Sequence, residues 1–170
     1  MKIVAKKYFK SFLLYGLTFG LLMTLWDYID EGKIDIIKLL FMSVFFGGIM
    51  SWTTVTAQKR AITKQGKKEL TEDDFKVSQC ESIIKEITIK EIYELLNSNE
   101  TTNKWKLDIK NSKIIGKTKT SWSSWGEKII ISVLKENIKI ESKPVLKTTM
   151  FDNGRNRENV LLIKQLIEKH

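Results

Sequence analysis

The residue types that carry nucleophilic or metal chemistry are scarce in this chain. Its 170 residues include one histidine, His170, and one cysteine, Cys80. A Ser-His-Asp triad, a Cys-His pair or a His/Cys metal site is therefore not favoured. The sequence contains neither a phosphate-binding loop nor a dinucleotide fingerprint, and its acidic residues show no pairing beyond ordinary solvated faces. We expect a protein that is not an enzyme and has no cofactor and no metal, and the lone thiol fits a reducing cytosol.

Two tryptophans three residues apart form the most distinctive pair in the second half of the chain. Trp122 and Trp125 lie beside Gly126 and Glu127. Because tryptophan contributes a large buried area, one interpretation is that the pair covers the open edge of a sheet or the end of a helix. The alternative is an aromatic lip that grips a lipid or a partner chain, with Gly126 making the turn that aims both rings.

A polar cluster lies where the last helix is expected to begin, at Asp152, Arg155, Asn156 and Arg157. One interpretation is a turn and helix cap with local ion pairs that include Glu127. The other is an anion site, because free backbone N–H groups at a helix start, together with the two arginines, suit a lipid phosphate. With Trp122 and Trp125, these residues form the predicted ligand or partner surface.

Two uncharged runs precede this region. Sixteen residues separate Lys10 from Asp27, and twenty separate Lys38 from Lys59. About 20 helical residues cross the hydrocarbon core of a bilayer, so the second run is long enough, and the first spans if Trp26 lies in the interface. We expect a transmembrane hairpin over 1–58, with helices at about 10–29 and 36–58. A cleaved signal peptide and a buried hairpin of a soluble protein are the alternatives.

The net charge of +9 is concentrated around these runs. Residues 1–10 carry +4, residues 27–38 carry −2, and residues 56–68 carry +5. By the positive-inside rule, we expect both termini to face the cytoplasm. Residues 69–170, with 18 basic and 16 acidic side chains, are close to neutral, so we expect membrane lipid and not nucleic acid as a partner. The linker 59–68 is expected to attract anionic lipid through Lys59, Arg60, Lys64, Lys67 and Lys68.

Small residues recur on one face of each predicted helix. They are Gly16 and Gly20 in the first and Ser43, Gly47 and Ser51 in the second. Small side chains let helix backbones approach closely in lipid. They pack the two helices of one hairpin together, or they pair hairpins into a homo-oligomer. Neither run has a central ionisable residue, which disfavours transport.

The last hundred residues, 69–170, show the periodicities of a cytosolic α+β domain. The segment 75–87 fits a helix or a strand, with a strand favoured in its second half. Thr88 and Glu91 form a capping box before a helix with Ile89, Ile92, Tyr93 and Leu96 on one face.

Two hairpins are expected next. A turn at Asn111 and Ser112 places Ile109 opposite Ile114, Leu107 opposite Gly116 and Trp105 opposite Thr118. A turn around Glu136 and Asn137 places Val133 opposite Ile140.

Pro144 is expected to end the last strand. Asn156 is expected to cap a helix reaching about Glu168, with its apolar face inward. The element order is β-α-β-β-β-β-α, and an antiparallel sheet with one apolar face must bury it. We therefore expect an α+β domain whose sheet packs on the C-terminal helix.

Two segments carry a family resemblance, SWSSWGEKIIISV at 121–133 and ESKPVLKTTMFDNGRNRENV at 141–160. They resemble an uncharacterised family of small bacterial membrane-attached domains with a Ser-Trp-x-Ser-Trp-Gly-Glu turn and an Asp-x-Gly-x-Asn-x-x-Asn-Val helix entry. The topology is similar to helix-grip or START-like domains, whose sheet wraps a long C-terminal helix, in some cases around an apolar ligand. The resemblance implies a fold more than an activity.

These observations predict a membrane-anchored protein whose cytosolic domain binds a lipid, an apolar ligand or a partner protein. The alternative is an accessory or immunity-type subunit of an envelope complex, with its specificity in the transmembrane hairpin.

Overall fold

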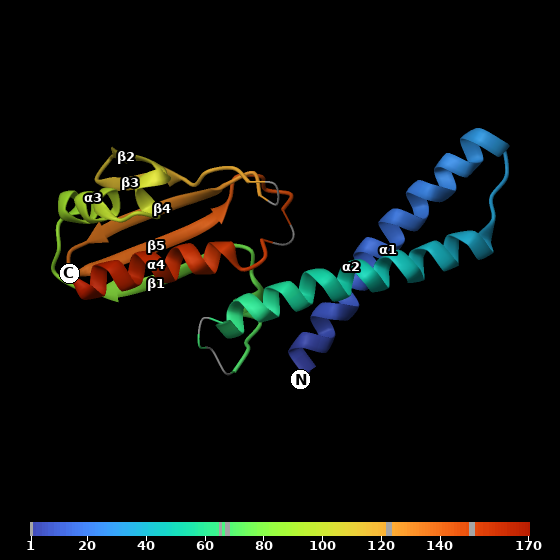
Figure 1. Ribbon diagram of the computed structural model, residues 1–170, viewed down its shortest axis with the longest axis horizontal. Helices are drawn as coiled ribbons and strands as arrows, with labels where there is room; N and C mark the ends of the chain where they lie inside the picture. Colours follow the sequence, from blue (N-terminus) through green and yellow to red (C-terminus); the bar gives the residue numbers. More distant parts are fainter. Residues whose placement is uncertain (1, 65, 67–68, 122–123, 150–151) are drawn as a thin grey trace. The chain divides into compact units, whose positions relative to one another are not determined.

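The computed structural model describes residues 2–170 except 65, 67–68, 122–123 and 150–151, and it divides the chain into two compact units (Figure 1). The first unit is Met1–Thr71 and the second is Glu72–His170. We describe each unit by itself.

The first unit is a pair of antiparallel helices, α1 (Lys2–Glu31) and α2 (Ile36–Lys64) (Figure 1). Both are long and apolar enough to cross a membrane, as the sequence predicts. Gly32 ends α1 with a positive φ of 68°, a conformation that glycine adopts without strain. Asp35 then caps α2, because its carboxylate accepts hydrogen bonds from the backbone N–H groups of Ile37 at 2.9 Å and Lys38 at 3.0 Å.

The helices are longer than the predicted spans of 10–29 and 36–58. α1 begins at Lys2, and α2 continues through Lys59, Arg60 and Lys64. The predicted linker 59–68 therefore starts inside a helix. Extending a formed helix adds one hydrogen bond per residue, and lysine, arginine and alanine are good helix formers.

The small residues of the hairpin lie where its two helices are closest. A methyl group added to Gly16 would lie 2.5 Å from the carbonyl oxygen of Ser43, and one added to Gly47 would lie 2.8 Å from the carbonyl oxygen of Phe12. Nothing lies within 4 Å of a methyl group added to the neighbouring Gly48. The two faces of small residues are therefore occupied by each other within one hairpin, and pairing of two hairpins would need other residues.

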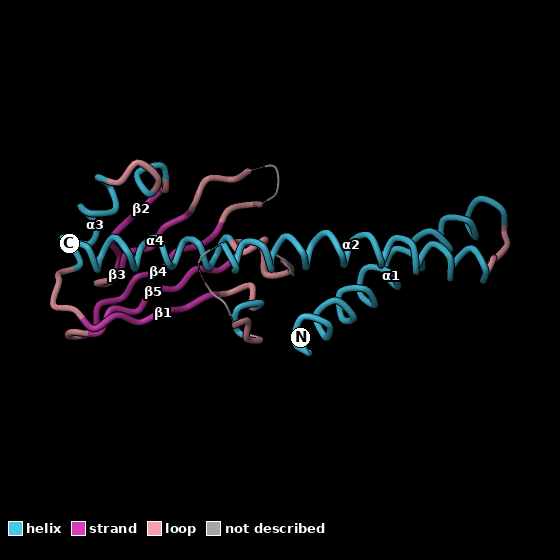
Figure 2. The backbone as a smooth tube through the Cα atoms, turned by 60° about the horizontal axis from the view of Figure 1, so that its bottom comes forward, coloured by secondary structure: helices cyan, strands magenta, loops and turns pink. Residues whose placement is uncertain are grey.

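The second unit is an α+β domain with five antiparallel strands in the order β1-β5-β4-β3-β2 and two main helices (Figures 1 and 2). This arrangement confirms the predicted fold class. The elements are η1 (Asp73–Phe75), β1 (Gln79–Ile84), α3 (Ile89–Ser98), η2 (Thr102–Lys104), β2 (Lys106–Lys110), β3 (Lys113–Lys117), β4 (Glu127–Leu134), β5 (Asn137–Pro144) and α4 (Arg155–Lys169).

Helices α3 and α4 lie on the same face of the sheet (Figure 2). That face carries the aliphatic core of the unit, in which side chains from the strands meet Ile92 and Leu96 of α3 and Val160, Ile163 and Ile167 of α4. The opposite face of the sheet, which we call the open face, is not covered by any described element of the same unit.

Local sequence signals place most elements correctly. Thr88 and Glu91 form the predicted capping box at the start of α3. The turn between β2 and β3 has positive φ at Asn111 (50°) and Ser112 (58°), which is the two-residue geometry that matches strand twist. The predicted pairs Ile109–Ile114 and Leu107–Gly116 are present, while the predicted Trp105–Thr118 pair lies beyond the ladder. Pro144 is the last residue of β5, as predicted.

The predicted register of the second hairpin is wrong by two residues. Val133 pairs with Ile138 and not with Ile140, because the chain turns over Lys135 and Glu136 alone. Lys135 adopts a positive φ of 56°, which suits a two-residue turn at this position. Since side chains alternate with a period of two, this shift leaves every residue of β5 on its predicted face.

Candidate functional site

The loop between β3 and β4, residues 118–126, contains the predicted tryptophan pair. Trp122 lies outside the described residues, and Trp125 is 70% exposed. Gly126 has a φ of +90°, and a Cβ there would lie 2.9 Å from the carbonyl oxygen of Thr118, so the close approach at this turn requires glycine. Trp125 therefore projects from the domain and does not cover its core.

Glu127 holds this loop closed. Its side chain is buried, and it accepts hydrogen bonds from the hydroxyls of Ser124, at 2.5 Å, and Thr118. The Glu127 backbone N–H in turn donates to Thr118 Oγ1 at 2.8 Å. A buried carboxylate is stable when hydroxyl and amide donors satisfy it, so these hydrogen bonds of Glu127 stabilise the loop. Glu127 does not pair with the arginines, contrary to one interpretation of the sequence.

The entry to α4 is built on Asp152. Its carboxylate accepts hydrogen bonds from the backbone N–H groups of Gly154 (3.1 Å) and Asn156 (2.8 Å) and from Asn156 Nδ2 (2.8 Å). Burial raises the pKa of Asp152 above its ordinary value, against the opposing effect of these hydrogen bonds. The capping prediction for Asn156 is wrong, because Gly154, with a φ of 79°, occupies the cap position and Asn156 lies inside the helix. Asn156 is fully buried and accepts a hydrogen bond from Ser142 Oγ at 2.6 Å.

The two arginines of the predicted anion site point to different partners. Arg157 forms an ion pair with Asp74 of η1 at 2.9 Å, and the side chains of Arg157 and Asp74 are only 14% and 1% exposed. Arg155 donates a hydrogen bond from Nη1 to Ser121 Oγ at 2.7 Å, which connects α4 to the loop between β3 and β4. Most residues of the predicted ligand surface therefore hold segments of the domain together through hydrogen bonds and an ion pair. Trp125 is exposed.

The open face carries a surface that the sequence interpretation missed. Lys106 of β2 lies opposite Lys117 of β3, which lies opposite Lys128 of β4, which lies opposite Lys143 of β5. The alternation of buried and exposed residues places all four side chains on the open face. We call this line of four residues the lysine row. At the usual strand spacing it is about 14 Å long.

The amino groups of the lysine row form no direct ion pairs among the described residues, although Lys143 is near enough to Glu141 to help lower the pKa of that carboxylate. Among the residues that the structure describes, none of the four has an ion-pair or hydrogen-bond partner. Other lysines on the same face are paired: Lys110 contacts Asp108 at 3.1 Å, and Lys139 contacts Glu141 at 2.5 Å. The hydrogen bond from Lys139 lowers the pKa of Glu141, and the nearby charges of lysines add to this effect. The open face is therefore strongly positive.

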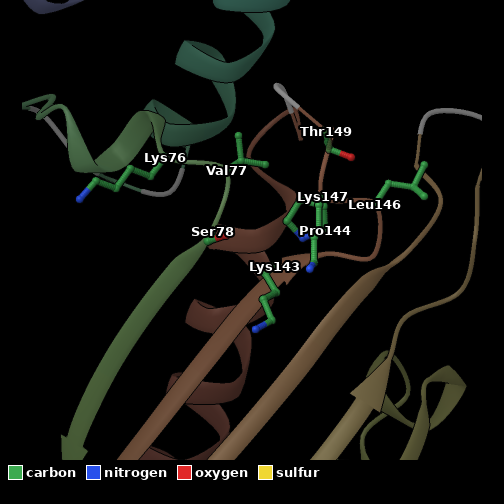
Figure 3. A pocket seen from close by; sticks show the side chains of 8 residues that line it. All are labelled: Lys76, Val77, Ser78, Lys143, Pro144, Leu146, Lys147 and Thr149. Atoms are coloured by element: carbon green, nitrogen blue, oxygen red, sulfur yellow. The ribbon is translucent and has the colours of Figure 1, made fainter.

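Each end of the lysine row meets a surface hollow. One, of about 580 Å³, is lined by Lys104, Lys106, Lys117, Thr118, Lys119 and Thr120. The other, of about 440 Å³, is lined by Lys76, Val77, Ser78, Lys143, Pro144, Leu146, Lys147 and Thr149 (Figure 3). Both hollows add lysines beyond those on the strands, although Lys76 is ion-paired with Asp73 at 2.6 Å.

The near-neutral charge of the domain concealed this surface. The outward positions of the five strands hold seven lysines and two acidic residues, whereas the remainder of the unit has more acidic than basic residues. A signal was present in the sequence, since the lysines occupy the polar positions of strands whose alternation was recognised. The row itself depends on the register of three strand pairs, which composition does not supply.

The predicted lipid contacts of the basic segment are described in part. Lys59, Arg60 and Lys64 lie on the last turns of α2, and Lys67 and Lys68 lie outside the described residues.

Comparisons of the chain with protein family models, with curated proteins and with solved structures find no match.

Proposed function

We propose that this chain is a non-enzymatic protein of the bacterial inner membrane, anchored by the α1–α2 hairpin with both termini in the cytoplasm, whose α+β domain is a binding module. The observation that carries the proposal is the pair of apolar helices, 30 and 29 residues long, that meet through glycines. Large apolar side chains such as Leu17, Phe41 and Trp52 point away from the helix contact and are exposed. In water such a surface is costly, and in lipid it is solvated.

The domain geometry supports binding at its surface. Its interior is filled by the aliphatic core between sheet and helices, whereas Trp125 and the open face are the features available to a partner. A membrane anchor raises the effective concentration of such a surface for anything in the same leaflet. The proposed ligand classes are therefore those present at a membrane: lipid or a membrane-associated protein.

Two experiments test this proposal. Alkaline carbonate extraction followed by flotation is expected to leave the full chain with the membrane, and its release into the supernatant would contradict the anchor. Replacing the hairpin by an unrelated two-helix anchor is expected to retain function in the cell. Loss of function on that replacement would instead favour the alternative, an accessory or immunity-type subunit whose hairpin makes the specific contacts.

A further inference from the structure

We infer that the open face of the sheet is a docking surface for the anionic headgroups of the bilayer in which the hairpin is anchored, with the lysine row as its centre. This inference rests on the proposed function and names the partner of the domain.

The lysine row is unfavourable for the isolated domain. Directly opposed side chains on neighbouring strands have Cβ atoms about 5 Å apart, and like charges in this position are destabilising. Lys106, Lys117, Lys128 and Lys143 make three such contacts in succession. A layer of negative charge laid over the face would remove this repulsion and gain the attraction of all four amino groups. The arrangement therefore fits an extended anionic surface better than a single small anion.

The chemistry of the face favours lipid headgroups over nucleic acid. The outward positions of the five strands, all of which the structure describes, contain neither an aromatic residue nor an arginine. Sheet surfaces that bind single-stranded nucleic acid use aromatic rings to stack bases, and arginine supplies bidentate contacts to phosphate and guanine. Lysine is a point charge on a flexible stem, suited to headgroups that diffuse and have no fixed geometry.

The tether keeps this face near the bilayer. Helix α2 ends at Lys64 and the domain begins at Glu72, so the connection spans roughly 28 Å at full extension. Within the domain, the entering segment lies at one end of the lysine row, because Lys76 and Ser78 line the same hollow as Lys143 (Figure 3). The chain therefore enters the domain at the end of the sheet that carries the row.

Cys80 provides the probe. It is the only cysteine of the chain, it is exposed, and it lies on the open face opposite Glu141, which is two residues along β5 from Lys143 of the row. The full chain, labelled at Cys80 with an environment-sensitive fluorophore, is placed in nanodiscs of phosphatidylcholine alone or with about a third phosphatidylglycerol. We expect a blue shift and a rise in emission in the anionic nanodiscs at low salt, reversed at high salt. A second chain, Cys80→Ser with Asn97→Cys on α3, reports from the helix side and is expected to respond weakly.

The matched variants separate this face from net charge. Lys117→Gln with Lys128→Gln is expected to lower the ratio of docked to free domain roughly 30-fold, because each of the two lysines removed contributes a factor of about five to six to the attraction for an anionic bilayer surface. Lys90→Gln with Lys169→Gln removes the same charge from outside the open face and is expected to change the ratio little. Equal losses in the two double variants, or equal responses from Cys80 and Asn97→Cys labels, would overturn the inference.

Two further arms assign a failure to its cause. Single-stranded RNA added to the phosphatidylcholine nanodiscs is expected to shift the Cys80 signal less than phosphatidylglycerol does, and the reverse order would replace the lipid by nucleic acid and overturn the inference. Flotation of the same chain after carbonate treatment reports on the anchor alone. A chain that floats and whose label ignores phosphatidylglycerol contradicts only the docking surface, whereas a chain that fails to float contradicts the proposed function.

Discussion

Lys117 and Lys128 lie directly opposite each other on β3 and β4, with both side chains on the open face and with no carboxylate paired to either among the described residues. Two positive charges in this position lower the stability of the fold that holds them. The folded domain should therefore become more stable when one of the two charges is removed.

Replacing Lys128 by glutamine is expected to stabilise the domain, by about 0.2–1 kcal/mol at low salt, because it removes two like-charge contacts. Urea unfolding of the full chain in detergent, followed by tryptophan fluorescence, measures the change. Lys139→Gln is the control, since Lys139 is paired with Glu141 and its loss brings no such gain. A Lys128→Gln variant no more stable than Lys139→Gln would contradict the prediction, and the gain should fade at high salt.

Gly47→Ala is expected to separate the helices of the hairpin, because the added methyl group would lie 2.8 Å from the backbone oxygen of Phe12. Gly48→Ala, one residue away with open space at its Cβ, is the control and is expected to leave the helix spacing unchanged. Spin labels at Phe9 and Trp52, both exposed, report the distance between the helices in nanodiscs after Cys80→Ser substitution. Equal distance distributions in the two alanine variants would rule out close packing at Gly47.

Arg157→Ala is expected to destabilise the domain by about 3–5 kcal/mol, because it removes the ion-pair partner of the buried carboxylate of Asp74. Arg155→Ala is expected to cost far less, since the hydrogen bond of Arg155 to Ser121 is exposed. Thermal unfolding compares the two. If Arg157 served an anion site and not the fold, its loss would weaken binding to anionic nanodiscs while leaving the melting temperature unchanged.

The start of α3 gives a pH dependence. Hydrogen bonds from the backbone N–H and hydroxyl of Thr88, each 2.7 Å long, lower the pKa of Glu91. A carboxyl group whose pKa is lower in the folded state contributes stability above its unfolded pKa and loses it as the pH falls through the folded value. The stability difference between the native chain and Glu91→Gln is therefore expected to be largest near neutral pH and to vanish in acid. Urea unfolding at several pH values checks this, and a constant difference would contradict it.

The sequence is most informative where a signal is local. The Thr88–Glu91 capping box, the Asn111–Ser112 turn and the two apolar helices are each encoded within a few turns or a few residues of chain, and each is present. The register of the β4–β5 hairpin was missed because KEN can place a two-residue turn at Lys135 and Glu136 or one residue later at Glu136 and Asn137. A local pattern fixes which face a side chain takes, and the position of the turn fixes which residue it meets.

The site was predicted less well than the fold because it depends on long-range pairing. Asn156 looked like a helix cap, and Asp152 performs that role from outside the helix. Glu127 was grouped with the arginines, and its partners are Ser124 and Thr118. The lysine row joins residues from four strands, so it exists only once strand order and register are known.

The pairing of β1 with β5 has a consequence for synthesis. Gln79 and Ser142 are neighbours in the sheet, but β1 leaves the ribosome well before β5. By that time the α1–α2 hairpin has already been made. Until β5 emerges, β1 has no partner strand in its own chain, and Ile83 has no core to enter. Non-local pairing of this kind delays folding until the whole domain has been translated. A chain that stops before Asn137 would therefore carry β1 without its partner strand, exposed to quality-control proteases.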